Sequence, residues 1–449
     1  MIPTDVHQQI DALNQQHILK HWESLTQEER STLAEQLLTI DLDTFTKLQR
    51  ALKKEKRAQG DYLPLEKHFL SGSEDKRKIG RELIASGRVG CIIMAGGMGT
   101  RLRFNGPKGM YPITLVQKKN LFQFFADRIL AAGKFYGREL PVAIMTSTLN
   151  DKVTRQFFRE NQNFGLSADQ LDFYVQGNLP FLNQEGDLFL DAPGHVAEGP
   201  NGNGELLHHF YRSGVWDKWK GQGVDFLNIV LIDNPLADPF DSELIGTHHA
   251  EGCDVLVKGM RREDPHEKLG ILVRIKDKVH VVEYSEMPLK DMEATQPDGE
   301  LKYPSGNLSL FSVTMDFAEK IAGTDLPLHK AFKALSYLDE AGERRQPEEP
   351  NAWKFEKFIF DILPFGNVEV ILYPRADCFA PLKNRVGKDS QKTVQQALQE
   401  FDRKAFSSVT GVEPPDRPFE LDPQFYYPTE ELLENWKGRS LPDTDYIKA

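Results

Sequence analysis

Residues 89–99 read VGCIIMAGGMG, an apolar run that passes directly into a glycine-rich turn. None of residues 89–94 carries a charge, and a continuous apolar run is typical of a strand that is buried on both faces. Glycine then recurs at 96, 97 and 99, where the backbone must turn sharply and approach another group closely. Such a turn after a buried strand favours phosphate binding, and the kind of phosphate has to be read from the rest of the chain.

Short apolar runs alternate with helical periodicity on the C-terminal side of this turn. We expect helices at 120–132 and 151–161, and strands at 141–147, 172–175 and 226–232. Further on we expect strands at 254–258, 271–275, 279–284, 307–313 and 367–373, and helices at 352–362 and 390–403. Alternating strands and helices predict a doubly wound, mostly parallel α/β sheet, with ligands at the carboxyl ends of its strands.

The length of 449 residues indicates more than one compact region. We expect an N-terminal helical segment over 1–85, a central α/β domain over 86–375 and a short C-terminal region over 376–449. In the first segment, Thr26 to Glu29 form a capping box, Asp43 is expected to cap the next helix, and residues 59–78 are expected to form a linker.

The composition excludes several classes of protein. Hydrophobic residues make up 40% and charged residues 27%, which is typical of a folded globular protein. The formal net charge of -12 disfavours nucleic-acid binding, which needs a basic surface. The three cysteines are far apart, no apolar run is long enough to span a membrane, and the N-terminus is polar. We therefore expect a cytoplasmic protein without a membrane partner.

Two common nucleotide-binding patterns do not fit the turn. A P-loop needs lysine directly after glycine and then a hydroxyl residue, whereas Lys108 lies between Pro107 and Gly109. A dinucleotide fingerprint needs a third glycine where this chain has Leu102, and the expected strand at 141–147 does not end in the acid that would hold a ribose.

The remaining pattern is GGMGTRL followed by PKG. The N–H groups of Gly96, Gly97 and Gly99 can form a nest for phosphate oxygens. Arg101 adds a forked donor, and Lys108 adds a point charge on a turn stiffened by proline. Two cations on one short loop favour a triphosphate over a dinucleotide; the alternative is an ordinary tight turn with solvated cations.

At these residues the chain resembles the sugar-nucleotide pyrophosphorylases, and among them the eukaryotic-type UDP-N-acetylhexosamine pyrophosphorylases. The resemblance extends in order over about residues 15–395. It is carried by PKGMY (107–111), LFQFFADRI (121–129), IMTS (144–147), NFGL (163–166), QGNLP (176–180), PNGNGEL (200–206), VVEYSE (281–286), FEKFIFDI (355–362) and FAPLKN (379–384). Arg103 stands where the family usually has glycine, and the region beyond about 395 is shorter and does not obviously match.

The resemblance implies a Rossmann-like nucleotidyltransferase sheet of the GT-A type and a uridylyltransferase activity. The enzyme would join UTP and an N-acetylhexosamine 1-phosphate to give UDP-GlcNAc or UDP-GalNAc and pyrophosphate, with Mg2+ as cofactor. The implied catalytic residues are Arg101, Lys108 and Lys383, and Asp233 is the implied metal ligand. The implied nucleotide-binding residues are Gly96, Gly97, Gly99, Gln176, Gly202 and Asn203, and the implied sugar-binding residues are Gly270, Glu283, Asn307, Phe358 and Phe360.

Two other functions remain open at this point. PKGMY and VVEYSE favour the N-acetylhexosamine branch, but a glucose 1-phosphate uridylyltransferase or a broad UDP-sugar pyrophosphorylase differs in only a few pocket residues. A non-catalytic UDP-sugar-binding regulator on the same fold is disfavoured, because such a protein need not keep Arg101, Lys108, Asp233 and Lys383 together. The oligomeric state is also open. The run Arg261 to Asp264 is expected to be a solvated loop.

Overall fold

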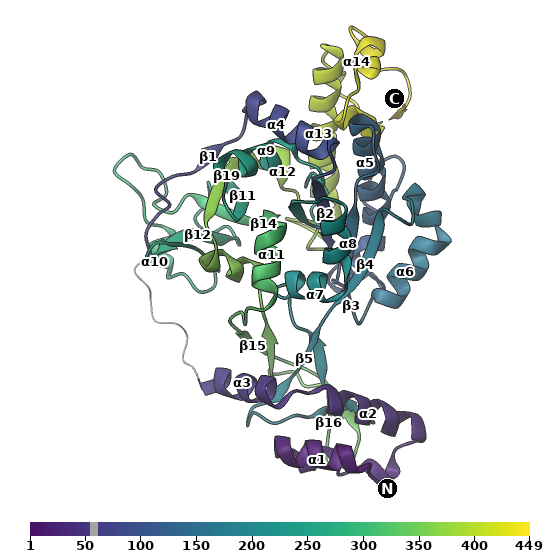
Figure 1. Ribbon diagram of the computed structural model, residues 1–449, viewed down its shortest axis with the longest axis vertical. Coiled ribbons are helices and arrows are strands. Elements are labelled where there is room, and N and C mark those ends of the chain that lie inside the picture. The colour runs from purple at the N-terminus through teal and green to yellow at the C-terminus, as the bar shows by residue number, and fades with distance from the viewer. Residues whose placement is uncertain (54–61) are drawn as a thin grey trace. The chain divides into compact units, whose positions relative to one another are not determined.

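The computed structural model describes residues 1–53 and 62–449 (Figure 1). The expected linker at 59–78 begins outside the described residues, and its described part is not only a linker, because it contains β1 (Phe69–Leu70) and the start of α4 (Glu74–Ala85). The chain forms two compact units, of which the smaller takes its residues from Met1–Gly60, Gln176–Glu205 and Asp325–Ile359. The larger unit contains Asp61–Val175, Leu206–Thr324 and Phe360–Ala449. This division follows three-dimensional contacts and cuts across the segment boundaries expected at 85 and 375.

The smaller unit begins with the expected helices. They are α1 (Thr4–Leu13), α2 (Gln27–Thr39) and α3 (Leu42–Lys53). The Thr26–Glu29 capping box is confirmed. The expected cap at Asp43 is wrong: Asp41 Oδ2 accepts the Thr44 N–H at 2.8 Å, and Asp43 instead pairs with Lys47 within the helix. Aspartates two residues apart offered two possible starts, and the backbone uses the earlier one.

Short strands complete the smaller unit. They are β5 (Asn178–Pro180), β6 (Leu182–Asn183), β7 (Leu190–Ala192), β8 (His195–Val196), β9 (Glu198–Pro200), β15 (His329–Lys333), β16 (Tyr337–Leu338), β17 (Arg344–Arg345) and β18 (Ala352–Glu356). The helix expected over 352–362 is wrong, because β18 pairs with β15 and with β6 and is followed by the 3₁₀ turn η6 (Ile359–Phe365). The aromatic residues at 353, 355, 358 and 360 fit a strand period as well as a helix period, and the partner strands decide between them.

The larger unit is built on one sheet, with the strand order β1-β19-β11-β14-β10-β2-β3-β4; β12 pairs with β14, and β13 pairs with β12 (Figure 1). The strands are β1 (Phe69–Leu70), β2 (Val89–Met94), β3 (Val142–Ser147), β4 (Leu171–Gln176), β10 (Phe226–Leu231), β11 (Val255–Arg261), β12 (Gly270–Ile275), β13 (Lys278–Val282), β14 (Ser305–Thr314) and β19 (Val368–Tyr373). Every residue of β2 and β3 is buried, so both faces of the sheet are covered there. The expected doubly wound, mostly parallel α/β sheet is confirmed.

Strand direction brings several loops to one edge of this sheet. β2, β3 and β10 are parallel neighbours, and β11 runs parallel to β19. β14 runs antiparallel to both β10 and β11, so its first residues lie where those strands end. The carboxyl ends of five strands and the beginning of β14 therefore meet at one edge, which is where ligands bind in such sheets.

Helices pack on the sheet and on one another. They are α4 (Glu74–Ala85), α5 (Leu121–Tyr136), α6 (Asp151–Glu160), α7 (Leu206–Arg212), α8 (Val215–Gly221), α9 (Ser242–Glu251), α10 (Leu289–Met292), α11 (Met315–Ala322), α12 (Arg375–Cys378), α13 (Gln391–Thr410) and α14 (Glu430–Trp436). α4 and α9 touch through glycines, since a Cβ on Gly80 would lie 1.7 Å from Ser242 O and one on Gly246 would lie 1.8 Å from Lys76 O. Two backbones can approach this closely only without side chains between them.

A buried ion pair supports the start of α9. Lys258 Nζ, on β11, donates to Asp241 Oδ2 at 2.6 Å, and Asp241 Oδ1 accepts the N–H groups of Glu243 and Leu244 at 3.0 Å. The Tyr373 hydroxyl also donates to Asp241 at 3.1 Å, and its ring lies 3.7 Å from Lys258 Nζ. Burial alone would raise the pKa of Asp241, but Lys258 and these hydrogen bonds hold it below its ordinary value.

Residues 390–449 form their own small core within the larger unit. α13, α14, the parallel pair β20 (Glu420–Leu421) and β21 (Tyr446–Ile447), and the 3₁₀ turn η7 (Pro423–Tyr426) enclose Phe406, Phe419 and Phe425. The Glu420 carboxylate accepts the N–H groups of Val116 and Gln117, which lie in the loop that leads to α5. This C-terminal segment is therefore bonded directly to the α/β core.

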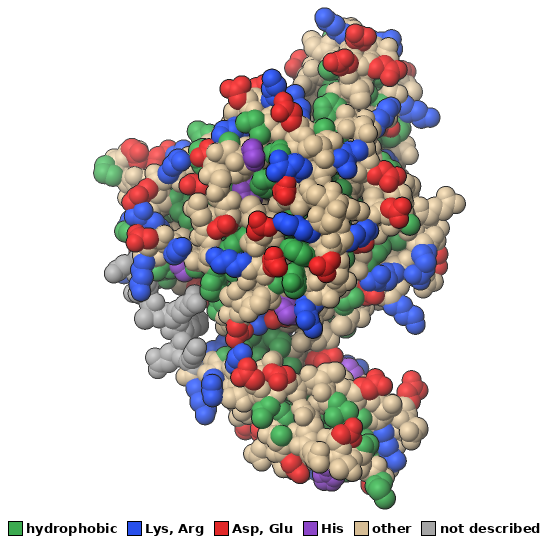
Figure 2. Space-filling view, viewed as in Figure 1, with side chains coloured by type: hydrophobic (Ala, Val, Ile, Leu, Met, Phe, Trp, Pro, Cys, Tyr) green, Lys and Arg blue, Asp and Glu red, His purple; other side chains and the backbone are tan. Residues whose placement is uncertain are grey.

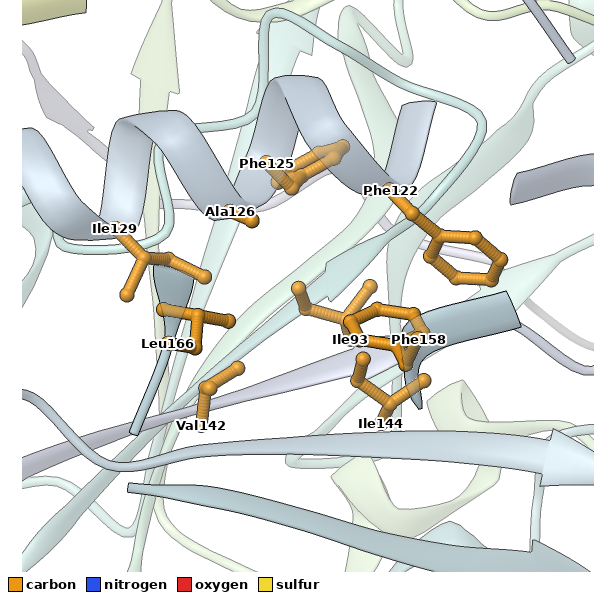
Figure 3. Close-up of a pocket in the computed structure, with 9 residues that line it drawn as sticks. All are labelled: Ile93, Phe122, Phe125, Ala126, Ile129, Val142, Ile144, Phe158 and Leu166. Carbon is orange, nitrogen blue, oxygen red and sulfur yellow. The ribbon is translucent and has the colours of Figure 1, made fainter. Parts of the chain in front are cut away.

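An apolar cavity lies between α5 and the sheet (Figure 3). Its lining is Ile93, Phe122, Phe125, Ala126, Ile129, Val142, Ile144, Phe158 and Leu166. These side chains offer no hydrogen-bonding group that would orient a polar substrate. The cavity is a gap in core packing, and the functional site has to be sought at the carboxyl edge of the strands.

None of the helices within residues 1–53 and 62–449 is both long and apolar enough to cross a membrane. Figure 2 shows lysine and arginine side chains interspersed with aspartate and glutamate over the face in view. Salt bridges of exposed or half-buried side chains, such as Lys218–Asp172 at 2.9 Å, account for part of this mixing. A group of cations without matching anions would therefore differ from the rest of this mixed surface.

Candidate active site

The glycine-rich loop leaves β2 at Met94 and is closed by its own backbone. Gly99 N–H donates to Gly106 O at 2.9 Å, and Lys108 N–H donates to Gly97 O at 3.0 Å. A Cβ on Gly99 would lie 2.8 Å from the Phe104 ring, so the turn needs glycine there. Because Gly99 N–H is used inside the loop, the phosphate nest expected from three glycines has Gly96, Gly97 and Met98 as its available donors. No acceptor within the described part of the chain bonds those three N–H groups.

Two side chains at the end of β3 brace this loop. Ser147 Oγ donates to Gly96 O at 2.8 Å, and Asn150 Nδ2 donates to Ala95 O at 2.9 Å and to Gly97 O at 3.4 Å. Asn150 Oδ1 in turn accepts the Ser147 N–H at 2.9 Å. The loop carbonyls are thus turned toward β3, which leaves its N–H groups on the other side. Ser147 and Asn150 were missed from the sequence, although Ser147 is the last residue of the strand expected at 141–147 and Asn150 lies three residues beyond it.

Arg101 and Arg103 follow on the 3₁₀ turn η3 (Thr100–Leu102). Leu102 is buried and anchors the turn, whereas both arginines are exposed. Arg103 ends the turn in the left-handed conformation, with φ 54° and ψ 37°, and its N–H donates to Thr100 O. A residue other than glycine is strained in that conformation by about 1 kcal/mol. Arg103 is therefore held by the turn that presents Arg101.

Lys108 and Asp233 form a buried ion pair. Lys108 begins the 3₁₀ turn η4 (Lys108–Met110), and its Nζ donates to Asp233 Oδ2 at 2.9 Å. The side chains are only 11% and 13% exposed. A Cβ on the next residue, Gly109, would lie 2.2 Å from the Phe122 ring, so the turn is pressed against α5 and Lys108 has little room to move.

The strand β10 ends just before Asp233, and the following residue ties in the segment that bears Lys383. Asn234 Nδ2 donates to Cys378 O at 2.8 Å, and Asn234 Oδ1 accepts the Ala380 N–H at 2.9 Å. Asp233 O accepts the Leu382 N–H at 2.7 Å. These three bonds place residues 378–383 against the end of β10, although the two segments are far apart in sequence.

The charges around Asp233 do not balance. Burial alone would raise the pKa of the Asp233 carboxyl, but Lys108, Lys383 and Arg101 together hold it below its ordinary value. The carboxylate is therefore ionised and faces three cations. The structure thus brings together four residues that the sequence analysis singled out, and their surplus of positive charge suits a polyanionic ligand.

A second group of expected residues gathers at the start of β12 and β14. Gly270 is paired with Asn307 across the two strands. A Cβ on Gly270 would lie 2.6 Å from Val281 Cγ1 and 3.3 Å from Glu283 Oε1, so glycine keeps this place open between the carboxylate and Asn307. Asn307 is nearly buried, and its Oδ1 accepts the Ser309 N–H at 3.1 Å. This trio lies at the same sheet edge as Asp233.

Arg261, Glu263 and Asp264 are exposed, as the charges of this run predict, but Arg262 is not. Arg262 is 2% exposed, and it donates to Tyr303 O at 2.8 Å and to Pro265 O at 2.9 Å. The neighbouring Glu267 is also buried and pairs with Arg375 and, at 3.6 Å, with Lys388. Those two cations flank Lys383 in the sequence, so Glu267 links the loop before Gly270 to the segment that carries Lys383.

Most of the other expected ligand residues belong to the smaller unit. Gln176, the last residue of β4, is buried. Gly202 has φ +84°, and a Cβ on it would lie 2.3 Å from Lys357 O. Asn203 Oδ1 accepts the Ile359 N–H at 3.0 Å, so the PNGNG loop is held against the end of β18. Phe358 is half-buried and its ring lies 4.7 Å from that of His329. Phe360, in the larger unit, is buried in the core.

No group of three or more His, Cys, Asp or Glu side chains that could hold a metal ion is found within residues 1–53 and 62–449. His248 is fully buried in α9, with Nδ1 2.6 Å from Ser312 Oγ and Nε2 3.0 Å from Cys253 O. Burial lowers its pKa to about 4, so it is a neutral core histidine. At the site formed by Lys108, Lys383 and Arg101, Asp233 is therefore the carboxylate that is available to a ligand.

Comparison with known proteins identifies the family of the chain. Residues 29–389 match a family described as UTP–glucose-1-phosphate uridylyltransferase. The chain belongs to this uridylyltransferase family. The resemblance to UDP-sugar pyrophosphorylases noted from the sequence is thereby confirmed.

Relatives in the family carry related names. UDP-N-acetylhexosamine pyrophosphorylase-like protein 1 of Homo sapiens is 31% identical over 422 residues, which covers 88% of this chain and 83% of the relative. UDP-N-acetylglucosamine pyrophosphorylase of Saccharomyces cerevisiae is 30% identical over 412 residues, 86% of each chain. The crystal structure of the Trypanosoma brucei UDP-N-acetylglucosamine pyrophosphorylase matches with a TM-score of 0.82 at 24% identity, covering 99% of this chain and 98% of the other. At this identity the likeness shows the fold.

Arg103 stands where the resemblance noted from the sequence implies glycine. Its backbone adopts the left-handed conformation that glycine favours. The backbone therefore keeps this turn although Arg103 is strained in it. The resulting extra cation lies two residues from Arg101.

Proposed function

We propose that this chain transfers the uridylyl group of UTP to an N-acetylhexosamine 1-phosphate, forming UDP-GlcNAc or UDP-GalNAc and releasing pyrophosphate. The observation that carries the proposal is the ionised Asp233 surrounded by Lys108, Lys383 and Arg101. Both substrates are polyanions, so a site with surplus positive charge suits them. The names of the relatives with about 30% identity support the N-acetylhexosamine branch.

The reaction needs charge neutralisation and alignment rather than a protein nucleophile. An oxygen of the sugar 1-phosphate attacks the α-phosphorus in line, a new O–P bond forms, and the bond to the bridging oxygen breaks as pyrophosphate leaves. The attacking phosphate is already largely deprotonated near neutral pH, since its second pKa is about 6. Lys108 would stabilise charge at the α-phosphate, Lys383 would hold the sugar phosphate, and Arg101 with the Gly96–Met98 N–H groups would hold the leaving phosphates.

The remaining residues would fix the two ends of the nucleotide sugar. Gln176 and the Gly202-Asn203 turn would recognise uracil, because an amide offers both a donor and an acceptor to a pyrimidine edge. Glu283 and Asn307 would bind sugar hydroxyls or the acetamido group, and Gly270 would leave room for the ring. Phe358 remains a candidate to line the sugar pocket. Phe360 is a weaker candidate, because only 5% of it is exposed.

A Mg2+ ion fits the donor set at Asp233. Mg2+ is commonly held by one or two carboxylates together with substrate phosphates, and Asp233 is an ionised carboxylate beside the proposed phosphate site. When bound, the ion would neutralise triphosphate charge and stabilise the leaving pyrophosphate. A cytoplasmic location is part of the proposal, and the three free, buried cysteines are compatible with it.

A side-by-side assay of pyrophosphate release tests the proposal. UTP is supplied with GlcNAc 1-phosphate, GalNAc 1-phosphate or glucose 1-phosphate, each with Mg2+ and with EDTA. We expect kcat/KM to be highest for an N-acetylhexosamine phosphate and turnover to stop in EDTA. Preference for glucose 1-phosphate would instead indicate a UTP–glucose-1-phosphate uridylyltransferase, the activity for which the family is named. Absence of turnover with all three, despite binding of UDP-sugar, would identify a binding protein instead.

A further inference from the structure

The C-terminal segment, residues 390–449, lies beyond the residues that match the family, yet it reaches the loop that follows Asp233. The Tyr427 hydroxyl, just after η7, donates to Asp238 Oδ1. The same carboxylate oxygen accepts the Phe240 N–H at 2.9 Å. Tyr427 is 5% exposed, and the Asp238 side chain is 31% exposed. One end of the Asp233–Phe240 loop is therefore bonded to the C-terminal segment.

Arg128, on α5, holds the middle of the same loop. Its Nη1 donates to Pro235 O at 2.9 Å and to Ala237 O at 3.0 Å, and the side chain is 2% exposed. The rings of Phe401 and Tyr426 lie 5.9 Å and 5.4 Å from the guanidinium carbon, so the C-terminal segment covers it. Two carbonyls of the Asp233–Phe240 loop thus bond the buried Arg128 guanidinium, and aromatic rings of the C-terminal segment cover that guanidinium.

The loop is short and stiff, so a shift at one end moves the other. Asn228 Nδ2, on β10, donates to Asp238 O and to Pro239 O, both at 2.8 Å. Pro235 and Pro239 further restrict the backbone angles of the Asp233–Phe240 loop. At the far end, Asp233 meets Lys108 and Asn234 holds the segment of Lys383. The position of Asp238 therefore constrains the position of Asp233.

We propose that Tyr427 and Arg128 are positioning residues, through which the C-terminal segment sets the place of Asp233 relative to Lys108 and Lys383. The inference rests on the proposed function, in which these three residues serve uridylyl transfer. Tyr427→Phe removes the hydroxyl and keeps the ring, so the loop loses one buried anchor. Because small misplacements of reacting groups are costly, we expect kcat to fall about tenfold, with KM for UTP changed less than about twofold.

The neighbouring residue provides a matched control. The Tyr426 hydroxyl donates to Asp402 Oδ1 on α13, within the C-terminal segment itself, and not to the Asp233 loop. Tyr426→Phe also removes one buried hydroxyl and keeps the ring beside Arg128. We expect this variant to lower the midpoint of thermal unfolding while kcat stays at the wild-type value. A purely structural role of Tyr427 would give the same pattern for both variants.

The experiment measures kcat, KM and thermal unfolding for the wild type, Tyr427→Phe and Tyr426→Phe. It adds a titration of Mn2+ in the presence of UTP, followed by electron paramagnetic resonance, with Asp233→Asn as the reference for a lost ligand. We expect Tyr427→Phe to weaken Mn2+ binding at least threefold and Tyr426→Phe to leave it unchanged. Equal Mn2+ affinities and equal kcat in the two tyrosine variants would overturn the inference. A wild type that turns over no sugar phosphate would refute the proposed function, while the Mn2+ titration still decides whether Tyr427 acts on Asp233.

Discussion

Lys108–Asp233 and Lys258–Asp241 are both buried lysine–aspartate pairs of the larger unit, but the chain surrounds them differently. Asp241 faces one lysine, two backbone N–H groups and the Tyr373 hydroxyl, so its negative charge is matched within the fold. Asp233 faces Lys108 together with Lys383 and Arg101. Lys258–Asp241 is therefore called the closed pair, because its charges are matched within the fold, and Lys108–Asp233 the open pair, because positive charge around it remains unmatched.

The difference separates a structural role from a ligand-binding role. Asp241 caps α9 and its lysine lies against the Tyr373 ring, so the buried closed pair supports the fold. The open pair lies at the carboxyl edge of the sheet, where an anionic ligand would complete the charge balance. Identical substitutions in the two pairs should therefore affect different properties of the protein.

The largest expected effect comes from breaking the closed pair. Lys258→Met leaves the buried Asp241 carboxylate without its cation, and we expect the free energy of unfolding to fall by about 3–5 kcal/mol. Urea unfolding with linear extrapolation measures the loss. The turnover of the protein that remains folded should stay near the wild-type value. A stable variant with lost turnover would show that Lys258 contributes to the reaction and not to the stability of the fold.

The same substitution in the open pair should have the opposite result. Lys108→Met leaves Asp233 beside Lys383 and Arg101, so we expect the unfolding free energy to change by less than about 1 kcal/mol. Turnover should fall by roughly 10²–10³-fold, as it does when one preorganised charge-stabilising donor is removed. Pyrophosphate release and urea unfolding of both variants, measured in parallel, form the test. Near-normal turnover of Lys108→Met would exclude its role at the α-phosphate.

The smallest expected effect concerns the turn that presents Arg101. Arg103→Gly relieves the left-handed strain, and we expect stability to rise by about 0.5–1 kcal/mol. Lys118→Gly is the matched control, because Lys118 is also exposed and has φ 54°. If Arg103 only ends the turn, both variants gain stability and both keep their turnover. A turnover loss confined to Arg103→Gly would add Arg103 to the cations of the open pair.

The sheet was largely predictable from sequence, because its central strands are continuous apolar runs bounded by glycine and polar residues. Val89–Met94 was predicted to the residue. Residues 352–362 were mispredicted, because their aromatic spacing fits two periods and tertiary pairing with β6 and β15 decides the outcome. The charge of Arg262 predicted a solvated loop, whereas its main partner is the carbonyl of Tyr303, far along the chain.

The site was predictable only in part. Gly96, Gly97, Arg101 and Lys108 stand on one short loop, so their proximity follows from sequence. Asp233 and Lys383 lie on distant segments, and the family resemblance, not spacing, predicted their meeting. The supports of the site, Ser147, Asn150, Asn234 and Tyr427, were missed, because a polar residue after a strand carries no mark of which loop it will bond.

The strand order also has a consequence for synthesis on the ribosome. β2, β3, β4 and β10 are neighbours in the sheet and have all been synthesised once residue 231 has been added. β1, the earliest strand of the sheet, has to wait for its partner β19, the last one. Long-range pairings of this kind are slow to form. A chain that stops before residue 383 would carry the glycine-rich loop and Asp233 without Lys383 or Tyr427, so the proposed site is completed only after most of the α/β core has been made.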